Sequence, residues 1–154
     1  MIWDLLFGCL VSVVNIMIHA AMTVTAIGTA RRVGLRPTNQ PRLHLMRVMV
    51  ATVLVLMLAH TIETAVWALS YVLVGVLPPD GEALYFAFVN YCTLGYGDIT
   101  PVKEWRLMGP MASMNGILMF GWSTAVLFEV LRKTIEHLGS VAPPGTPFSS
   151  ADRG

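Results

Sequence analysis

Hydrophobic residues form three long stretches along this chain, and polar, glycine or proline residues separate each stretch from the next. The stretches run from about Ile2 to Ala30, from Val48 to Leu77 and from Leu107 to Leu131. A helix needs about 20 mostly apolar residues to cross the hydrocarbon core of a bilayer. The pattern therefore predicts an all-α membrane protein with three transmembrane helices per subunit.

A shorter segment, residues 78–105, lies between the second and third stretches and is too interrupted to cross a membrane. Residues 83–92 are apolar and aromatic, enough for about 15 Å of helix, or half a bilayer. We expect Asp80 to cap this helix, with Glu82 in its first turn. A glycine-bearing run, residues 93–98, follows. This order predicts a re-entrant hairpin, with a short pore helix entering the membrane and an extended loop leaving it.

The glycine-bearing run has a spacing that suits an ion filter. Backbone that is not helical is tolerated at membrane depth only where protein buries it or where it lines a watery cavity. In a pore, consecutive carbonyls aimed at one axis replace the water around a cation. Such aiming requires alternating backbone hands, and glycine adopts positive φ at little steric cost. We therefore expect ion-binding carbonyls along the run Thr93, Leu94, Gly95, Tyr96 and Gly97.

Together with Asp98, this run resembles the potassium channel signature Thr-Val-Gly-Tyr-Gly-Asp, with Leu94 in place of valine. The resemblance covers about residues 48–133, as outer helix, pore helix, filter and inner helix in family order. It implies that K+ is the permeant ion and that Asp98 supports the outer end of the filter. One filter loop per chain cannot enclose an ion, so the resemblance also implies a homotetramer.

The predicted inner helix carries a second part of the resemblance. Residues 116–125, Gly-Ile-Leu-Met-Phe-Gly-Trp-Ser-Thr-Ala, are similar to the inner helix of bacterial proton-gated potassium channels. Gly116 matches the gating hinge of that family. A stripe with spacings of three and four residues either lines the cavity or packs as ordinary helix core, and Phe128 is the candidate constriction. The stripe contains Ile117, Phe120, Thr124 and Phe128.

The predicted pore helix departs from the family pattern. Val89 stands where the proton-gated channel has a glutamate behind its filter, and Tyr85 and Phe86 stand where it has two tryptophans. We therefore expect a different network behind this filter, in which Tyr85 donates its hydroxyl to Asp98. We also expect the Tyr96 ring to wedge against the aromatic pore helix.

Polar residues inside the predicted spans form a second group of candidates. Four of them recur on one face of the second helix, namely His60, Glu63, Trp67 and Tyr71. Glu63 either bonds the back of the pore helix or senses pH together with His60, and the structural role is favoured. Asn15 and His19 share a face of the first helix. Because no third ligand is evident, we expect interhelical hydrogen bonds there rather than a metal.

Charge and composition set the topology. The chain has 154 residues, of which 55% are hydrophobic and 12% are charged, against about 25% charged in soluble domains. The net charge of +1 gives no reason to expect a nucleic acid partner. Basic residues mark cytoplasmic loops, so we expect an extracellular or periplasmic amino terminus, an uncleaved first helix and a cytoplasmic carboxyl terminus. The basic residues are Arg31, Arg32, Arg36, Arg42, Arg47, Arg132 and Lys133.

The predicted organisation has four parts. They are a peripheral helix at residues 1–30, a basic linker at 31–47, a pore domain at 48–137 and a disordered cytoplasmic tail at 138–154. Within the pore domain we expect an outer helix at 48–77, a pore helix at 83–92, the filter at 93–98 and an inner helix at 107–137.

These features predict a channel that conducts K+ passively, in contact with membrane lipids and with no cofactor besides the permeant ion. An enzyme is not expected, because no nucleophile, base and orienting group converge on a motif. A poorly selective cation channel is one alternative, since Leu94 departs from the signature. A non-conducting partner subunit of a channel or transporter complex is another.

Overall fold

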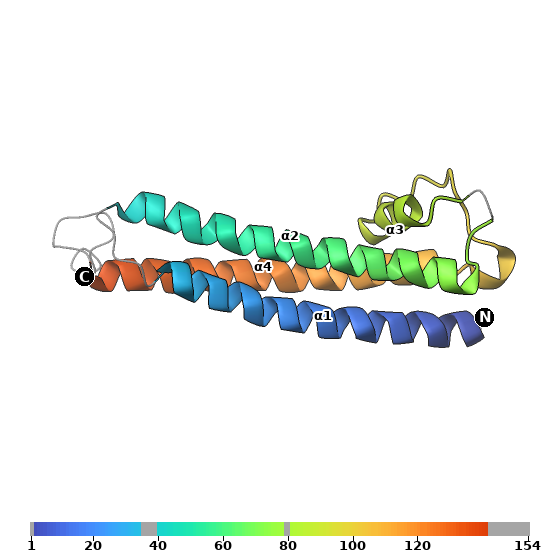
Figure 1. Ribbon diagram of the computed structural model, residues 1–154, viewed down its shortest axis with the longest axis horizontal. Helices are drawn as coiled ribbons and strands as arrows, with labels where there is room; N and C mark the ends of the chain where they lie inside the picture. The colour runs from blue at the N-terminus through green and yellow to red at the C-terminus, as the bar shows by residue number, and fades with distance from the viewer. Residues whose placement is uncertain (1, 35–39, 79–80, 142–154) are drawn as a thin grey trace. The chain divides into compact units, whose positions relative to one another are not determined.

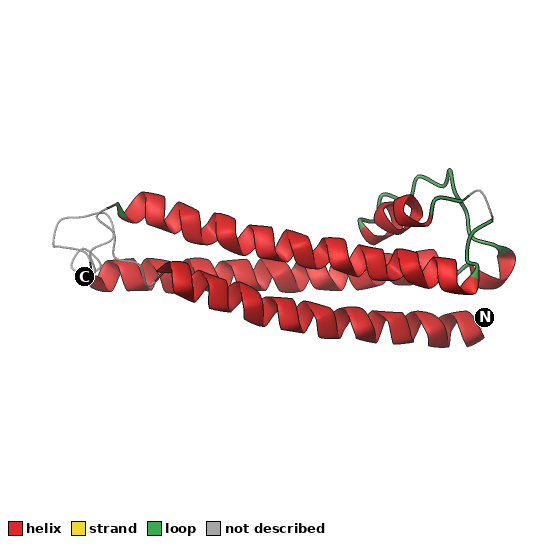
Figure 2. Cartoon of the chain, in the orientation of Figure 1, coloured by secondary structure: helices red, strands yellow, loops and turns green. Residues whose placement is uncertain are grey.

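The computed structural model describes residues 2–34, 40–78 and 81–141, and the described part contains helices and loops but no strand (Figure 2). The elements, labelled in Figure 1, are α1 (Ile2–Gly34), α2 (Pro41–Val74), α3 (Ala83–Tyr91), a 3-10 helix (Lys103–Trp105) and α4 (Met108–Val141). Among the described residues, three helices are long and apolar enough to cross a membrane: α1, α2 and α4 with the 3-10 turn before it. The all-α class predicted from the sequence is confirmed.

The long helices extend beyond the predicted spans. Helix α1 continues to Gly34 and α2 begins at Pro41, so both enter the predicted linker at 31–47. Arginine is a good helix former, and proline suits the first helical position, so these polar ends stay helical outside the apolar stretches. Residues 35–39, with Arg36, lie outside the described residues. Helix α4 also includes residues 138–141 of the predicted tail, whose remainder is not described.

Helix α2 ends at Val74, before the predicted end at Leu77, because of a glycine. Gly75 has a φ of +66°, in the left-handed region. The Val76 amide donates to the Tyr71 carbonyl at 2.9 Å, as in a Schellman motif. This cap satisfies a helix-end carbonyl and turns the chain toward the pore helix.

Helix α3 matches the predicted pore helix to within one residue, but its start differs in detail. Glu82 occupies the N-cap position and makes no side-chain capping bond. The predicted cap, Asp80, lies outside the described residues. At the other end, Cys92 is the C-cap, and its amide donates to the Phe88 carbonyl at 3.0 Å. The apolar helix thus ends directly before the glycine-bearing run.

One compact unit contains α1 as far as Met22 and residues 57–122, with α3 and the candidate filter. Its core joins aromatic residues of α2 and α3: the Trp67 and Tyr71 rings lie 5.9 Å apart, and those of Tyr71 and Phe86 lie 5.3 Å apart. Of the four residues that share one face of α2, Glu63, Trp67 and Tyr71 are buried and His60 is half-buried. Packing on this face holds the pore helix in place.

A second compact unit contains residues 23–56 and the part of the chain from Ser123 onward. Its core consists of small and branched apolar side chains, namely Ala26, Ala30, Val48, Leu56, Val126 and Val130. Small residues let membrane helices approach closely. On its exposed surface Arg132 pairs with Glu129 at 2.8 Å, as expected for solvated helix-end charges.

Candidate functional site

The backbone angle φ alternates in sign along the glycine-bearing run. Thr93, Gly95 and Gly97 have φ angles of +61°, +58° and +76°, whereas Leu94 and Tyr96 are not among the residues with positive φ. The two glycines were expected to adopt this conformation from their spacing. Thr93 was not, because a β-branched residue with positive φ is a strained outlier. Its conformation extends the alternation to the first residue of the run.

The last turn of α3 holds the start of this loop. The Thr93 amide donates to the Asn90 carbonyl at 2.8 Å, and the Leu94 amide donates to the Val89 carbonyl at 2.9 Å. The Ser113 hydroxyl of α4 also donates to the Asn90 carbonyl, at 2.7 Å. Carbonyls at a helix end lack intrahelical partners, and here the loop and α4 supply them. The loop is therefore continuous with the end of the pore helix.

The Asp98 end of the loop is tied to the start of α3. The Tyr85 hydroxyl donates to Asp98 Oδ2 at 2.6 Å, and the Ile99 amide donates to Asp98 Oδ1 at 3.0 Å. The expected hydrogen bond between Tyr85 and Asp98 is thus present. This bond holds the pKa of Asp98 below its ordinary value and raises the pKa of Tyr85.

Two side chains of the candidate filter are little covered by their own chain. Leu94 is 58% exposed and Tyr96 is 66% exposed. The predicted wedge of Tyr96 against the pore helix is therefore not made within a single chain. Behind the loop lies a cavity of about 160 Å³, whose lining includes Phe86, Val89, Gly95, Gly97 and Gly109. Val89 thus presents an apolar side chain to the cavity behind the loop.

Helix α4 packs closely against the end of α3 at a glycine, Gly116. A Cβ added to Gly116 would lie 2.1 Å from the Tyr91 carbonyl oxygen, closer than any real contact. Sequence reasoning assigned Gly116 to a gating hinge and missed this packing constraint. A local pattern does not show which backbone a helical glycine meets.

The predicted stripe on α4 is exposed on this chain. Ile117 and Phe128 are 59% and 67% exposed, so packing within the chain does not account for them. The Phe120 ring packs against His60, with the two ring centroids 4.6 Å apart. Thr124 is also exposed.

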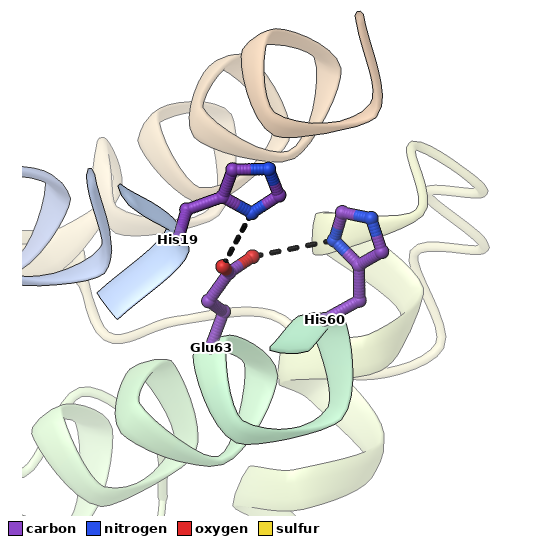
Figure 3. Close-up of side chains that lie close together, drawn as sticks. All are labelled: His19, His60 and Glu63. Atoms are coloured by element: carbon purple, nitrogen blue, oxygen red, sulfur yellow. Dashed lines mark hydrogen bonds and ion pairs between the residues drawn. The ribbon is translucent and has the colours of Figure 1, made fainter. Parts of the chain in front are cut away.

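A buried carboxylate joins α1, α2 and α3. The His19 Nδ1 atom lies 2.8 Å from Glu63 Oε1, and the His60 Nδ1 atom lies 3.2 Å from Glu63 Oε2 (Figure 3). The Tyr91 hydroxyl of α3 donates to Glu63 Oε2 in a short hydrogen bond. Glu63 therefore bonds the back of the pore helix, which is the structural role favoured from the sequence.

Sequence reasoning placed His19 and Glu63 on separate helices and did not bring them together. The sequence showed no third potential metal ligand beside Asn15 and His19. In the structure, His60 and Glu63 of α2 face His19. Periodicity identifies the inward face of each helix, but not which faces meet or at what height. Tyr91 was missed because an aromatic residue in an apolar helix gives no polar signal.

A second buried polar contact lies beside this cluster. The Asn15 side-chain amide of α1 donates to Asn115 Oδ1 at 3.1 Å and to the Glu63 carbonyl at 3.3 Å. The Trp67 indole of α2 also donates to Asn115 Oδ1, at 3.1 Å. The expected interhelical hydrogen bonding of Asn15 is confirmed. It joins α1 to both α2 and α4.

Three membrane-length helices and a short helix consistent with a pore helix define a multi-pass membrane protein with an ion-channel pore domain. The chain belongs to the family described as "Ion channel", whose family model matches residues 45–133, more than half of the chain. Such proteins are not enzymes, in agreement with the sequence prediction. No curated protein and no solved structure matches the chain. The matched region includes α2 from residue 45, α3 and the candidate filter, and excludes α1.

Proposed function

We propose that this chain is a subunit of a homotetrameric, potassium-selective channel. Its filter is the run Thr93 to Gly97, with Asp98 and Tyr85 supporting the outer end and Phe86 packing behind. K+ moves passively down its gradient and is coordinated by main-chain oxygens that replace its hydration shell.

The alternation of φ along the filter is the observation that carries this proposal. In an ordinary strand, successive carbonyls point to opposite sides. Positive φ at Thr93, Gly95 and Gly97, with none between, favours carbonyls that face one common side. Rings of such oxygens are what a pore needs to strip water from K+.

Exposed residues around the filter support a tetramer. A single loop supplies one oxygen per level and cannot surround an ion, so several chains have to contribute. Tyr96 and Leu94 are exposed on the isolated chain, and Phe88 of α3 is also exposed. In the proposed assembly neighbouring subunits cover these side chains. The carboxyl ends of the four α3 helices, each carrying about half a negative charge, then stabilise a cation in the cavity.

The remaining parts follow the predicted organisation. Helix α1 is a peripheral helix, and α4 is the inner helix, with Gly116 as the hinge. Exposed Ile117, Phe120 and Thr124 line the cavity, with Phe128 at the constriction. The basic residues near the α1–α2 connection and at the end of α4 support cytoplasmic placement of both, which puts the amino terminus and the filter on the outer side.

Flux from purified protein in liposomes tests this function. We expect K+ efflux from vesicles containing wild-type protein, much less Na+ flux under the same gradient, and a particle mass of four chains. Equal Na+ and K+ flux would favour the poorly selective cation channel. No flux from a monomeric or dimeric protein would overturn the proposal in favour of a partner subunit.

A further inference from the structure

The polar cluster behind the pore helix contains a set of metal-ligand types that the proposed conduction pathway does not use. His19 comes from α1, and His60 and Glu63 come from α2 at a spacing of three residues. One ligand atom from each of these residues lies within 4.8 Å of the other two. Figure 3 shows both imidazoles turned toward the Glu63 carboxylate.

The observed separations suit ligands of one ion. Zinc bonds of about 2.0–2.1 Å in a tetrahedral site place neighbouring ligand atoms about 3.3 Å apart. His19 Nδ1 lies 2.8 Å from Glu63 Oε1, and His60 Nδ1 lies 3.2 Å from the other carboxylate oxygen, Oε2. Small side-chain rotations therefore suffice to admit a cation. The Tyr91 hydroxyl, 3.2 Å from His60 Nδ1, is placed to supply a fourth ligand, an oxygen.

The surroundings of the cluster favour a positive ion. His19 and Glu63 are fully buried, and the His60 side chain is 17% exposed. The Trp122 ring covers His19 with a centroid distance of 5.3 Å, and the Phe120 ring covers His60. Buried carboxylates are paired or coordinate metals, because an isolated charge is costly away from water. A divalent cation held by one carboxylate and two neutral imidazoles meets this requirement.

We propose that His19, His60 and Glu63 form a binding site for a divalent transition metal of the zinc class. Two imidazole nitrogens and one carboxylate oxygen match Zn²⁺ or Co²⁺, whereas Mg²⁺ and Ca²⁺ prefer oxygen ligands and Cu⁺ prefers sulfur. On binding, the Nδ1 lone pairs and a carboxylate oxygen turn to the ion, and any proton held between them leaves. The bound metal ties α1 to α2 behind α3.

This site does not depend on which ion passes the filter. Its ligands come from α1 and the middle of α2, and α1 lies outside the region that matches the ion-channel family. A failure of K+ selectivity would therefore not contradict the metal site. A failure of metal binding would likewise not contradict K+ selectivity.

Metal titration of the full-length protein, purified without a polyhistidine tag and freed of metal, tests the proposal. Co²⁺ binding is followed by its visible absorption, and Zn²⁺ is added as the competitor. The variants are Glu63→Gln, His60→Gln and His19→Gln. The matched control is His137→Gln, because His137 is exposed and lies in the other compact unit. X-ray absorption of zinc-loaded wild type reports the ligand atoms without any substitution.

We expect one Co²⁺ per chain in wild type and in His137→Gln, displaced by Zn²⁺, and affinity at least about tenfold weaker in each cluster variant. The X-ray absorption spectrum of the zinc-loaded protein should show two imidazole nitrogens bound to the metal, with oxygen as the remaining ligands. Lack of Co²⁺ binding by wild type would overturn the proposal, as would undiminished binding by folded cluster variants. Sulfur in the first shell would instead indicate Cys9 or Cys92. If the variants do not fold, the wild-type spectrum alone decides.

Discussion

Gly116 of α4 lies directly against the backbone carbonyl of Tyr91, at the end of the pore helix. A methyl group at Gly116 would stand 2.1 Å from that oxygen and 3.0 Å from the carbonyl carbon. A backbone carbonyl cannot rotate away as a long side chain can. Close approach of α4 to the end of α3 therefore depends on the missing side chain at this position.

Gly116→Ala is the first prediction. We expect it to lower the free energy of unfolding by about 1–3 kcal/mol, because the new methyl group forces α4 away from α3. Gly121→Ala on the same helix is the control, since its Cβ meets nothing within 4 Å. The control should be neutral or stabilising by up to about 1 kcal/mol, through better helix propensity. Thermal unfolding in detergent measures both, and equal melting temperatures would contradict the packing role.

The filter backbone gives the second prediction. Gly97 has a φ of +76°, where an L-alanine is strained by about 1–2 kcal/mol. We expect Gly97→Ala to abolish K+ flux from liposomes while the protein still inserts and assembles. Gly28→Ala is the control, because Gly28 is helical and a Cβ there has open space. Normal flux through Gly97→Ala would show that this conformation is not needed for conduction.

The contact between Tyr85 and Asp98 predicts a defined pH dependence. The Tyr85 hydroxyl keeps the pKa of Asp98 below the ordinary value of 3.8. The contact is therefore complete at neutral pH and is lost only as the pH falls through that lowered pKa. Tyr85→Phe removes the donor, so the pKa of Asp98 should rise and protonation should begin at a higher pH.

Carbon-13 NMR titration of the Asp98 carboxyl measures this shift in wild type and in Tyr85→Phe. Tyr71→Phe is the control, because the Tyr71 hydroxyl bonds the Met108 carbonyl instead. An Asp98 titration that is the same in all three proteins would mean that the Tyr85 contact is not maintained in the membrane-embedded protein.

Asn115 is predicted to matter more for stability than Asn15. Its side-chain oxygen accepts hydrogen bonds from both Asn15 and Trp67. Asn15 donates to this oxygen and to the Glu63 carbonyl, so its loss removes donors and leaves Asn115 Oδ1 with the Trp67 bond. Asn115→Ala leaves two buried donors without this acceptor. It should lower the free energy of unfolding by about 1–3 kcal/mol. Asn15→Ala should have a smaller effect, nearer 0.6 kcal/mol, the approximate average for interhelical bonds in a membrane. Thermal unfolding of both variants tests the order, and the reverse order would refute it.

Phe128 is predicted to restrict the pore. If four Phe128 side chains meet at the constriction, Phe128→Ala should leak K+ under conditions that keep wild type closed. Phe128→Leu retains an apolar side chain of similar length and should remain closed. Single-channel recordings in planar bilayers measure the open probability of each. Wild-type behaviour of Phe128→Ala would remove Phe128 as the gate.

Most of the fold was accessible from the sequence because the membrane imposes a strong constraint. Stretches such as Val48 to Leu77 have no other stable setting, and the short helix before the glycines follows from its length. The positions of the helix ends were harder to predict from the sequence. Basic residues continue a helix as readily as they end it, and the cap at Gly75 depends on a local φ that composition does not show.

The candidate site divides in the same way. The alternating backbone at Gly95 and Gly97 follows from glycine chemistry, so spacing was enough to predict it. The meeting of His19 with Glu63 depends on how two helices are aligned along their lengths, which periodicity does not encode. The partners in the hydrogen bonds between helices are therefore the part that required three-dimensional structure.

The hydrogen bonds of α1 set a limit on protein engineering. A minimal version trimmed to the family-matched region would discard Asn15 and His19. The Glu63 carboxylate would then lose His19 and keep His60 and Tyr91, and the Asn115 amide would lose Asn15 and keep Trp67. Transplanting this pore into another scaffold thus calls for a replacement polar helix, or for Leu or Met at both positions.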